Sequence, residues 1–194
     1  MFPKRLNRTV IYESQWINLY ADKVLMPSGK IIEKYHQLDY PKESVTVLLL
    51  NTKQEICFIK SLRYTTNKIE WEIPSGSVEK GEDILVAAER EVVEETGLKT
   101  KALKHIFSYN PCNGMSNQTI HIIFGEVSET LQAEFDTDEV QEVFWLSQKK
   151  VKILIDNNEI VDGVSLIPLL FYFSGTLSQK NITQQRISDI NNVR

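Results

Sequence analysis

Three glutamates, Glu91, Glu94 and Glu95, occur within five residues in a stretch whose pattern predicts a helix. Residues three and four apart share one face of a helix, so the three carboxylates would lie on one stripe. Carboxylates held together on a rigid element repel one another unless a cation neutralises them. Hard oxygen ligands of this kind suit magnesium or manganese. The spacing therefore predicts a divalent-metal site.

A second interpretation of the same helix has to be weighed. A glutamate-rich helix is often simply a solvated face, in which Arg90 pairs with Glu94 one turn later and contributes a few tenths of a kcal/mol. The fixed spacing argues against this interpretation. The stretch has a glycine at 76, a glutamate at 82, and then an Arg-Glu-Val-Val-Glu-Glu-Thr-Gly-Leu run from residue 90 to residue 98.

The residues around the glutamates predict how they are positioned. Gly76 and Gly81 bracket a turn in which unusual backbone angles are inexpensive. Glu82 or Asp83 then provides a carboxylate at a helix start, and the helix is expected over residues 82–96. Gly97 is the expected left-handed stop.

This pattern resembles the Nudix box, the signature of the Nudix hydrolases. The resemblance implies an α/β fold, an α/β/α sandwich around a mixed sheet, and hydrolysis of a nucleoside diphosphate linked to a further group. It also implies that Glu91 and Glu95 hold Mg²⁺, with Mn²⁺ possible, and that the carbonyl of Ser75 completes the coordination. Glu94 would be a further ligand or a base, and Arg90 would orient the acids.

The segment before the box resembles the ADP-ribose pyrophosphatase branch of that family. On this match Arg63 would hold a phosphate or ribose oxygen through its planar fork of donors, and a surface arginine at a strand end is an equally good interpretation. Glu72 would bind substrate or support the site. The acidic segment 134–140 resembles the one that delivers a base to the attacking water, with Asp138 or Glu139 as the candidate.

Downstream of the box, Pro111 resembles the proline of that branch, but residues 116–118 carry amides in place of acids. ADP-ribose is therefore the first candidate substrate, and GDP-mannose, another nucleotide sugar or a dinucleotide are alternatives. A non-catalytic nucleotide sensor built on the same fold is the alternative from another class of protein. A small-molecule nucleotide is thus the expected partner.

Composition further limits the class of protein to which the chain can belong. The chain has 194 residues, 42% of them hydrophobic, which is enough for one domain with a small appendage. The net charge of −4 gives no electrostatic footprint for nucleic acid. Cys57 and Cys112 are distant in sequence and are expected to be reduced thiols of a cytoplasmic protein. The apolar run at 164–173 is too short to span a membrane.

Three units are expected along the chain. Residues 1–40 form a small antiparallel β-subdomain with extended segments at 9–13, 16–26 and 30–38, too small to be stable unless it docks on the body or on a second copy. The resemblance implies a homodimer there, in which Trp16, Tyr20 or Tyr35 stacks a base; each is otherwise core. Residues 41–174 form the Nudix domain, and residues 175–194 a polar tail. The remaining strands are expected at 44–50, 55–62, 101–109, 119–127 and 142–146, and helices at 148–156 and 164–173.

Overall fold

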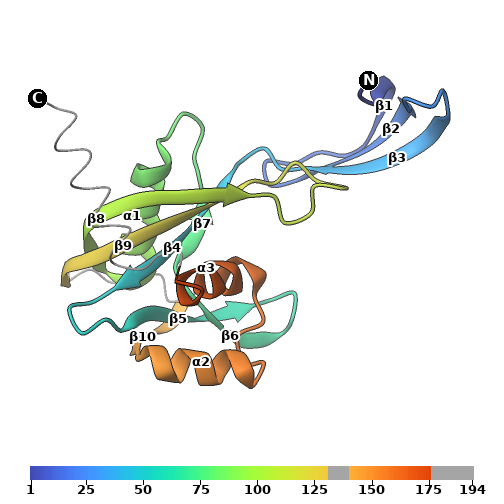
Figure 1. The fold of residues 1–194 in the computed structure, drawn as a ribbon. Coiled ribbons are helices and arrows are strands. Elements are labelled where there is room, and N and C mark those ends of the chain that lie inside the picture. Colours follow the sequence, from blue (N-terminus) through green and yellow to red (C-terminus); the bar gives the residue numbers. More distant parts are fainter. Residues whose placement is uncertain (131–139, 176–194) are drawn as a thin grey trace, which may run out of the picture.

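The computed structural model of the chain describes residues 1–130 and 140–175, and it divides into a narrow arm and a larger body (Figure 1). In the described residues the arm is an antiparallel sheet of three strands in the order β1-β2-β3. Its strands are β1 (Lys4–Tyr12), β2 (Asn18–Leu25) and β3 (Ile31–Asp39). The sequence predicted β1 too short, because residues 4–8 are mostly polar and gave no apolar alternation.

A polar network holds the arm together. Arg8 of β1 donates two hydrogen bonds of 2.8 Å to Asp22 of β2 and one of 3.0 Å to Gln37 of β3. The same guanidinium lies 3.9 Å from the ring centre of Tyr20. Charge-assisted bidentate pairs of this kind are stronger than neutral hydrogen bonds. Hydrogen bonds of Arg8 therefore connect all three strands of the arm, while most side chains of β1 remain exposed.

The body contains a mixed sheet, which within the described ranges has seven strands. The path is β10-β5-β4-β9-β8, with β6 paired to β5 and β7 to β4. Only the β4–β9 pairing is parallel among those described. The strands are β4 (Ser44–Leu50), β5 (Ile56–Arg63), β6 (Lys68–Glu72), β7 (Ser75–Ser77), β8 (Leu98–Tyr109), β9 (Ile120–Thr130) and β10 (Val140–Leu146).

Helices cover both faces of this sheet (Figure 1). Helix α1 (Ile84–Thr96) packs its buried alanines and Val92 against alternate residues of β4, such as Val45 and Val47. Helices α2 (Gln148–Asp156) and α3 (Gly163–Phe173) enclose the opposite face. The α/β/α sandwich with a mixed sheet, preceded by a small antiparallel sheet, is thereby confirmed.

Local signals for the helices are also present in the structure. Asp83 caps α1 by accepting from the Leu85 N–H at 2.8 Å, and Gly97 ends it with φ 64°. Ser147 caps α2 as its hydroxyl accepts from the Lys150 N–H at 3.3 Å. Both ends of α1 and the start of α2 thus have a capping contact for one of their orphan backbone groups.

Helix α3 contains a proline. It begins at Gly163, and Pro168 lies inside it. A proline has no N–H to donate to the carbonyl four residues earlier, which is that of Val164. The hydroxyl of the fully buried Thr46 donates to this carbonyl instead, at 3.3 Å. Strand β4 therefore compensates for the proline of α3.

The arm also contacts the loop between β8 and β9. The Leu38 N–H donates to the Met115 carbonyl at 2.8 Å. The side chain of Asn117 accepts from the Tyr40 N–H at 2.7 Å and donates to Asp39 at 2.8 Å. The arm and this loop consequently form one connected surface, side by side in Figure 1.

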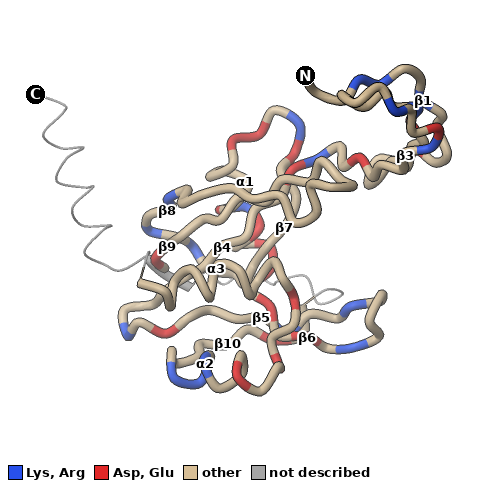
Figure 2. Tube along the Cα trace, turned by 45° about the vertical axis from the view of Figure 1, so that its right-hand side comes forward, with Lys and Arg blue, Asp and Glu red and all other residues tan. Residues whose placement is uncertain are grey.

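Charged residues are interspersed over arm and body. Figure 2 shows basic and acidic residues on both the arm and the body. Among the described residues, no helix is long and apolar enough to cross a membrane.

Candidate active site

Glu95 is the most buried of the three helix glutamates. It is 8% exposed, and its Oε2 accepts from the Ser75 N–H at 2.9 Å. Burial raises the pKa of Glu95 to about 8, and the nearby negative charge of Glu91 adds to this rise. A buried carboxylate with one backbone donor therefore lies where the end of α1 meets β7.

Glu91 lies one turn earlier and explains why residue 76 is a glycine. A Cβ atom on Gly76 would lie 2.0 Å from the carboxyl carbon of Glu91. The side chain of Glu91 is 13% exposed, and burial raises the pKa of its carboxyl. Strand β7 can approach α1 this closely only without a side chain at position 76.

Arg90 connects the turn before α1, residues 77–82, to the helix itself. Its Nε and one terminal nitrogen donate to Glu82, both at 3.0 Å, and the Ser77 carbonyl accepts at 2.8 Å. Its other terminal nitrogen donates to Glu91 at 2.7 Å and to Glu94 at 3.1 Å. All five N–H donors of the guanidinium are used. The Arg90–Glu94 pair is thus one part of a larger network, not an isolated surface pair.

The three helix carboxylates differ in exposure, because the side chain of Glu94 is 54% exposed. In the described part of the chain, no group of three or more His, Cys, Asp or Glu side chains is arranged so that it could hold a metal ion. A metal site made of all three carboxylates therefore stays a prediction. Glu91 and Glu95 with a backbone oxygen still fit magnesium, which typically binds one or two carboxylates and completes its shell with water and substrate phosphate.

Arg63 and Glu72 form an ion pair at the end of β5. The Arg63 Nε donates to Glu72 at 2.7 Å, and one terminal nitrogen donates to the other oxygen of the same carboxylate. The side chain of Glu72 is 4% exposed and that of Arg63 is 39% exposed. The hydrogen bonds to Glu72 raise the pKa of Arg63 above its ordinary value. The charge of Arg63 also lowers the pKa of Glu95, so the pair borders the carboxylate site.

Several side chains near this site gave no signal in the sequence. Asp162 caps α3, and its charge acts on both Arg63 and Tyr109. Burial raises the pKa of the Tyr109 hydroxyl to about 12. Among the described residues, the hydroxyls of Ser61 and Tyr109 are the buried side-chain polar atoms without a hydrogen-bond partner. Only chain folding brings Asp162, which is far from Arg63 and Tyr109 in the sequence, close enough to act on both.

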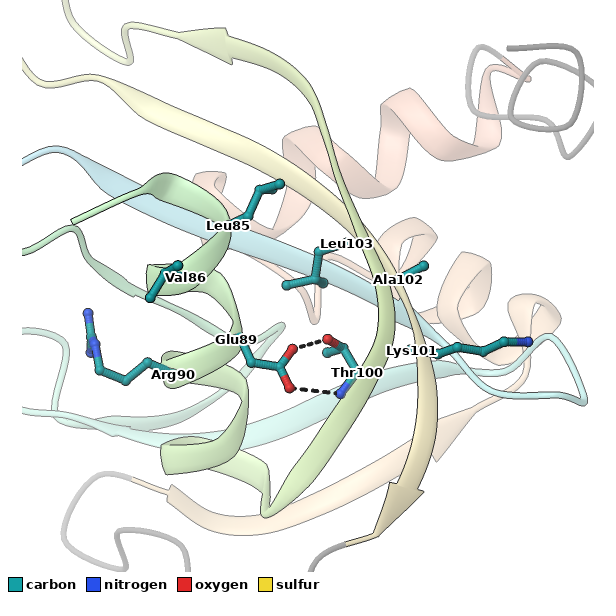
Figure 3. A pocket seen from close by; sticks show the side chains of 8 residues that line it. All are labelled: Leu85, Val86, Glu89, Arg90, Thr100, Lys101, Ala102 and Leu103. Carbon is teal, nitrogen blue, oxygen red and sulfur yellow. Dashed lines mark hydrogen bonds between the residues drawn. The ribbon is translucent and has the colours of Figure 1, made fainter. Parts of the chain in front are cut away.

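Glu89 shows that an acid of the box helix can be purely structural. Its carboxylate accepts from the Thr100 N–H at 3.1 Å and from the Thr100 hydroxyl, as Figure 3 shows. Arg90 in the same view points away from Glu89. Glu89 therefore fastens α1 to β8, on a side of the helix other than that of the Arg90 network.

The remaining candidates from the sequence are the predicted bases and the aromatic residues that could stack a base. Glu139 and Asp138 lie outside the described residues. Tyr20 is buried under Arg8, and the Tyr35 hydroxyl donates to the Gly114 carbonyl. Trp16 is 65% exposed with the Lys42 ammonium 5.4 Å from its ring centre, which leaves it the most accessible of the three aromatic residues.

Comparison with known proteins agrees with the fold and the box. The family model for the NUDIX domain matches residues 41–164, and the model for the nucleoside diphosphate sugar hydrolase N-terminal domain matches residues 3–38. The chain belongs to the Nudix family and is a Nudix hydrolase. Members of this family generally use divalent metals.

Particular relatives narrow the resemblance. An ADP-ribose pyrophosphatase of Bacillus subtilis is 30% identical over 82% of this chain and 86% of its own. A hydrolase of a CMP-linked phosphonate, CMP-5'-(N-acetyl-N-hydroxy-3-aminopropyl)phosphonate, from Streptomyces rubellomurinus is 26% identical over 83% of this chain and 77% of its own. The crystal structure of an ADP compounds hydrolase superposes with a TM-score of 0.79 at 14% identity, covering 90% of this chain and 94% of the other.

Proposed function

We propose that the chain hydrolyses the pyrophosphate bond of a nucleoside diphosphate sugar, with ADP-ribose as the first candidate and AMP and ribose 5-phosphate as products. The observation that carries this proposal is that the charge of Arg63 acts on the buried Glu95, which lies one turn after Glu91 on the same helix. A cation-binding carboxylate pair next to a phosphate-binding arginine suits a diphosphate bridge. The names of two relatives, both ADP-compound hydrolases, support the same substrate class.

Mg²⁺ is the proposed cofactor, with Mn²⁺ as a substitute, and Glu91, Glu95 and the Ser75 carbonyl are its proposed ligands. When bound, such an ion neutralises phosphate charge and lowers the pKa of a bound water. The raised pKa values of both glutamates fit this role, since burial disfavours their charged forms more than Arg90 beside Glu91 and the charge of Arg63 near Glu95 offset, and a bound cation would favour the charged forms.

The chain supplies the remaining groups. Arg90 fixes the direction of Glu91 and Glu94, and the more exposed Glu94 can take a proton from an attacking water. Glu139 is the alternative base. Two N–H groups of Arg63 are bound to Glu72, so three remain to donate to a phosphate or ribose oxygen. Glu72 thereby acts as the support that orients Arg63.

The arm is proposed to form a homodimer. Strand β1 is exposed along most of its length, including Val10 and Ile11, and such a strand is a template for a second chain. Residues 1–40 would then serve docking and residues 41–174 catalysis. A cytoplasmic location is proposed because Cys57 and Cys112 are both free thiols.

The direct test is a substrate panel with Mg²⁺ or Mn²⁺, in which phosphate is measured after added phosphatase. ADP-ribose is expected to be cleaved faster than GDP-mannose, other nucleotide sugars and dinucleotides. Fastest cleavage of deoxynucleoside triphosphates would contradict the substrate class. Nucleotide binding without turnover at any metal concentration would instead favour the sensor.

A further inference from the structure

A chain of four hydrogen-bonded side chains lies outside the residues assigned above. His105 Nε2 lies 2.9 Å from Ser108 Oγ, and Ser108 Oγ lies 2.7 Å from His121 Nδ1. The other ring nitrogen of His121, Nε2, lies 2.9 Å from Glu43 Oε2. The two imidazole rings have centroids 5.5 Å apart. Strands β8 and β9 and the start of β4 thus bring both histidines around one hydroxyl.

The carboxylate fixes which nitrogen of His121 carries a proton. A carboxylate only accepts hydrogen bonds, so His121 Nε2 carries the hydrogen, and Nδ1 of the neutral ring presents a lone pair. In that tautomer the Ser108 hydroxyl would donate to this lone pair, and its oxygen would accept from His105 Nε2–H. A bulge in β8 between His105 and Phe107 allows both rings to converge. Both ring nitrogens therefore aim at one point.

We propose that His105 and His121 form a transition-metal site of the Zn²⁺ class, in which the cation displaces the Ser108 hydroxyl between them. Imidazole nitrogen suits Zn²⁺, Ni²⁺ or Cu²⁺, whereas Mg²⁺ prefers oxygen. A histidine ligand commonly donates its second N–H to a carboxylate, which orients the ring and raises its basicity. Glu43 holds this position on His121.

Exposure fits a site that is oriented and still accessible. The side chain of His121 is 12% exposed, so its ring is held in place, whereas His105 and Ser108 are exposed. His105 can change tautomer in contact with water and rotate the short distance that a Zn–N bond of about 2.0–2.1 Å requires. Because Glu43 binds the far nitrogen of His121, the site has two protein ligands, and water completes it.

The site is connected to the box turn through the backbone. The Glu43 carbonyl accepts from the Val78 N–H at 2.9 Å, and Val78 precedes the turn that leads into α1. A cation on His121 would therefore stabilise the junction of β4, β8 and β9 in the folded chain only. Binding of this kind raises the melting temperature.

The test is Zn²⁺ binding to the untagged full chain by isothermal titration calorimetry, in excess Mg²⁺ so that the carboxylate site is occupied. His105→Ala and His121→Ala are each expected to weaken binding by at least about tenfold, and Glu43→Gln by about tenfold. Ser108→Ala should retain or strengthen binding, because the competing hydroxyl is gone. The expected signature in ¹⁵N NMR is a shift of His105 Nε2 and His121 Nδ1 on adding Zn²⁺.

Matched controls are available in the same chain. His36→Ala, on β3 of the arm, and Cys112→Ser, an exposed thiol, should leave the affinity unchanged. Thermal melts identify variants that fail to fold, and His105→Gln replaces His105→Ala if the latter does. Unchanged affinity in both folded histidine variants, or loss of binding in Ser108→Ala, would overturn the proposal.

Discussion

At the scale of residues, the glutamates of the box helix have different surroundings and therefore different chemistry. Glu95 is buried against the Ser75 N–H, Glu91 lies against Gly76, Glu94 is half exposed, and Glu89 binds Thr100. Position on the helix alone does not separate these roles. They are separated by what each side chain contacts, which is β7 for Glu95 and Glu91 and β8 for Glu89.

Glu95→Gln is expected to reduce turnover to background while the fold is kept, because the change preserves size and removes the charge that a cation needs. Steady-state hydrolysis of ADP-ribose with Mg²⁺ measures this, beside circular dichroism. Glu89→Gln is the comparison variant, since it keeps an acceptor for Thr100 and lies away from the site. Near-normal turnover in Glu95→Gln would refute the metal role.

The pH dependence of stability follows from the pKa of Glu95. This pKa is about 8 in the metal-free fold against an ordinary 4.5, so between these values the folded protein holds a proton that the unfolded chain has released. The contribution of Glu95 to the free energy of unfolding is therefore fully present below pH 4.5. It is lost as the pH rises from 4.5 to 8, by up to a few kcal/mol. In a chelator, the melting temperature of the wild type should fall relative to Glu95→Gln over this range. Parallel curves for the two proteins would contradict the shift.

Gly76→Ala is expected to displace the Glu91 carboxylate, because the new methyl group would lie 2.0 Å from its carboxyl carbon. A misplaced catalytic group can lower the rate on the order of 100-fold. Gly163→Ala is the matched control, since a Cβ there has no heavy atom within 4 Å. Equal kcat/KM for the two variants would show that the close approach is not needed.

At the scale of elements, strands complete what the helices lack. Strand β7 has only three residues and no apolar pattern, yet it pairs with β4 and carries Ser75 and Gly76 to α1. Strand β4 also provides the hydroxyl of Thr46 for the carbonyl that Pro168 leaves without an intrahelical donor. The position of each helix relative to the sheet thus depends on polar contacts as well as on the apolar core.

Thr46→Val should destabilise the fold by about 1–3 kcal/mol, because the Val164 carbonyl loses its donor. In a Pro168→Ala background the helix can supply its own N–H to that carbonyl, so the same change should have a smaller effect. Urea unfolding of the four proteins forms a double-mutant cycle. Strictly additive effects would show that Thr46 does not compensate for the proline.

At the scale of the whole molecule, the arm and the body differ in what stabilises them. The body buries apolar residues on both faces of its sheet, whereas the arm leaves Leu6, Val10 and Ile11 about half exposed. Small sheets are marginal when isolated. Self-association through the arm would bury this surface.

The native chain is expected to sediment as a dimer of 22.4 kDa protomers. Val10→Asp, at a residue 52% exposed on β1, should shift the equilibrium toward monomer, because a charge would be buried in the contact. Val86→Asp on α1, 58% exposed, is the control on the body. A wild type that is monomeric at all concentrations tested by analytical ultracentrifugation would refute the proposed dimer.

Several parts of this protein follow from local rules and can be predicted from the order of its residues. An acidic helix start at Glu82 or Asp83, the stop at Gly97 and the buried run of β4 follow from backbone preference and hydrophobicity, and the box spacing identifies the family; the structure assigns the cap to Asp83. These features involve neighbours within a few residues, so they can be read along the chain.

Which acids are buried and what Arg63 contacts depend on how distant parts of the chain pack together. Glu94 and Glu95 are adjacent in sequence, yet one is solvated and the other lies beneath β7. Arg63 with Glu72, Thr46 with Val164, and His105 with His121 meet through pairings between distant strands and helices. The physical reason is that burial, and with it pKa and hydrogen-bond partner, is set by what packs against a residue and not by its neighbours in sequence.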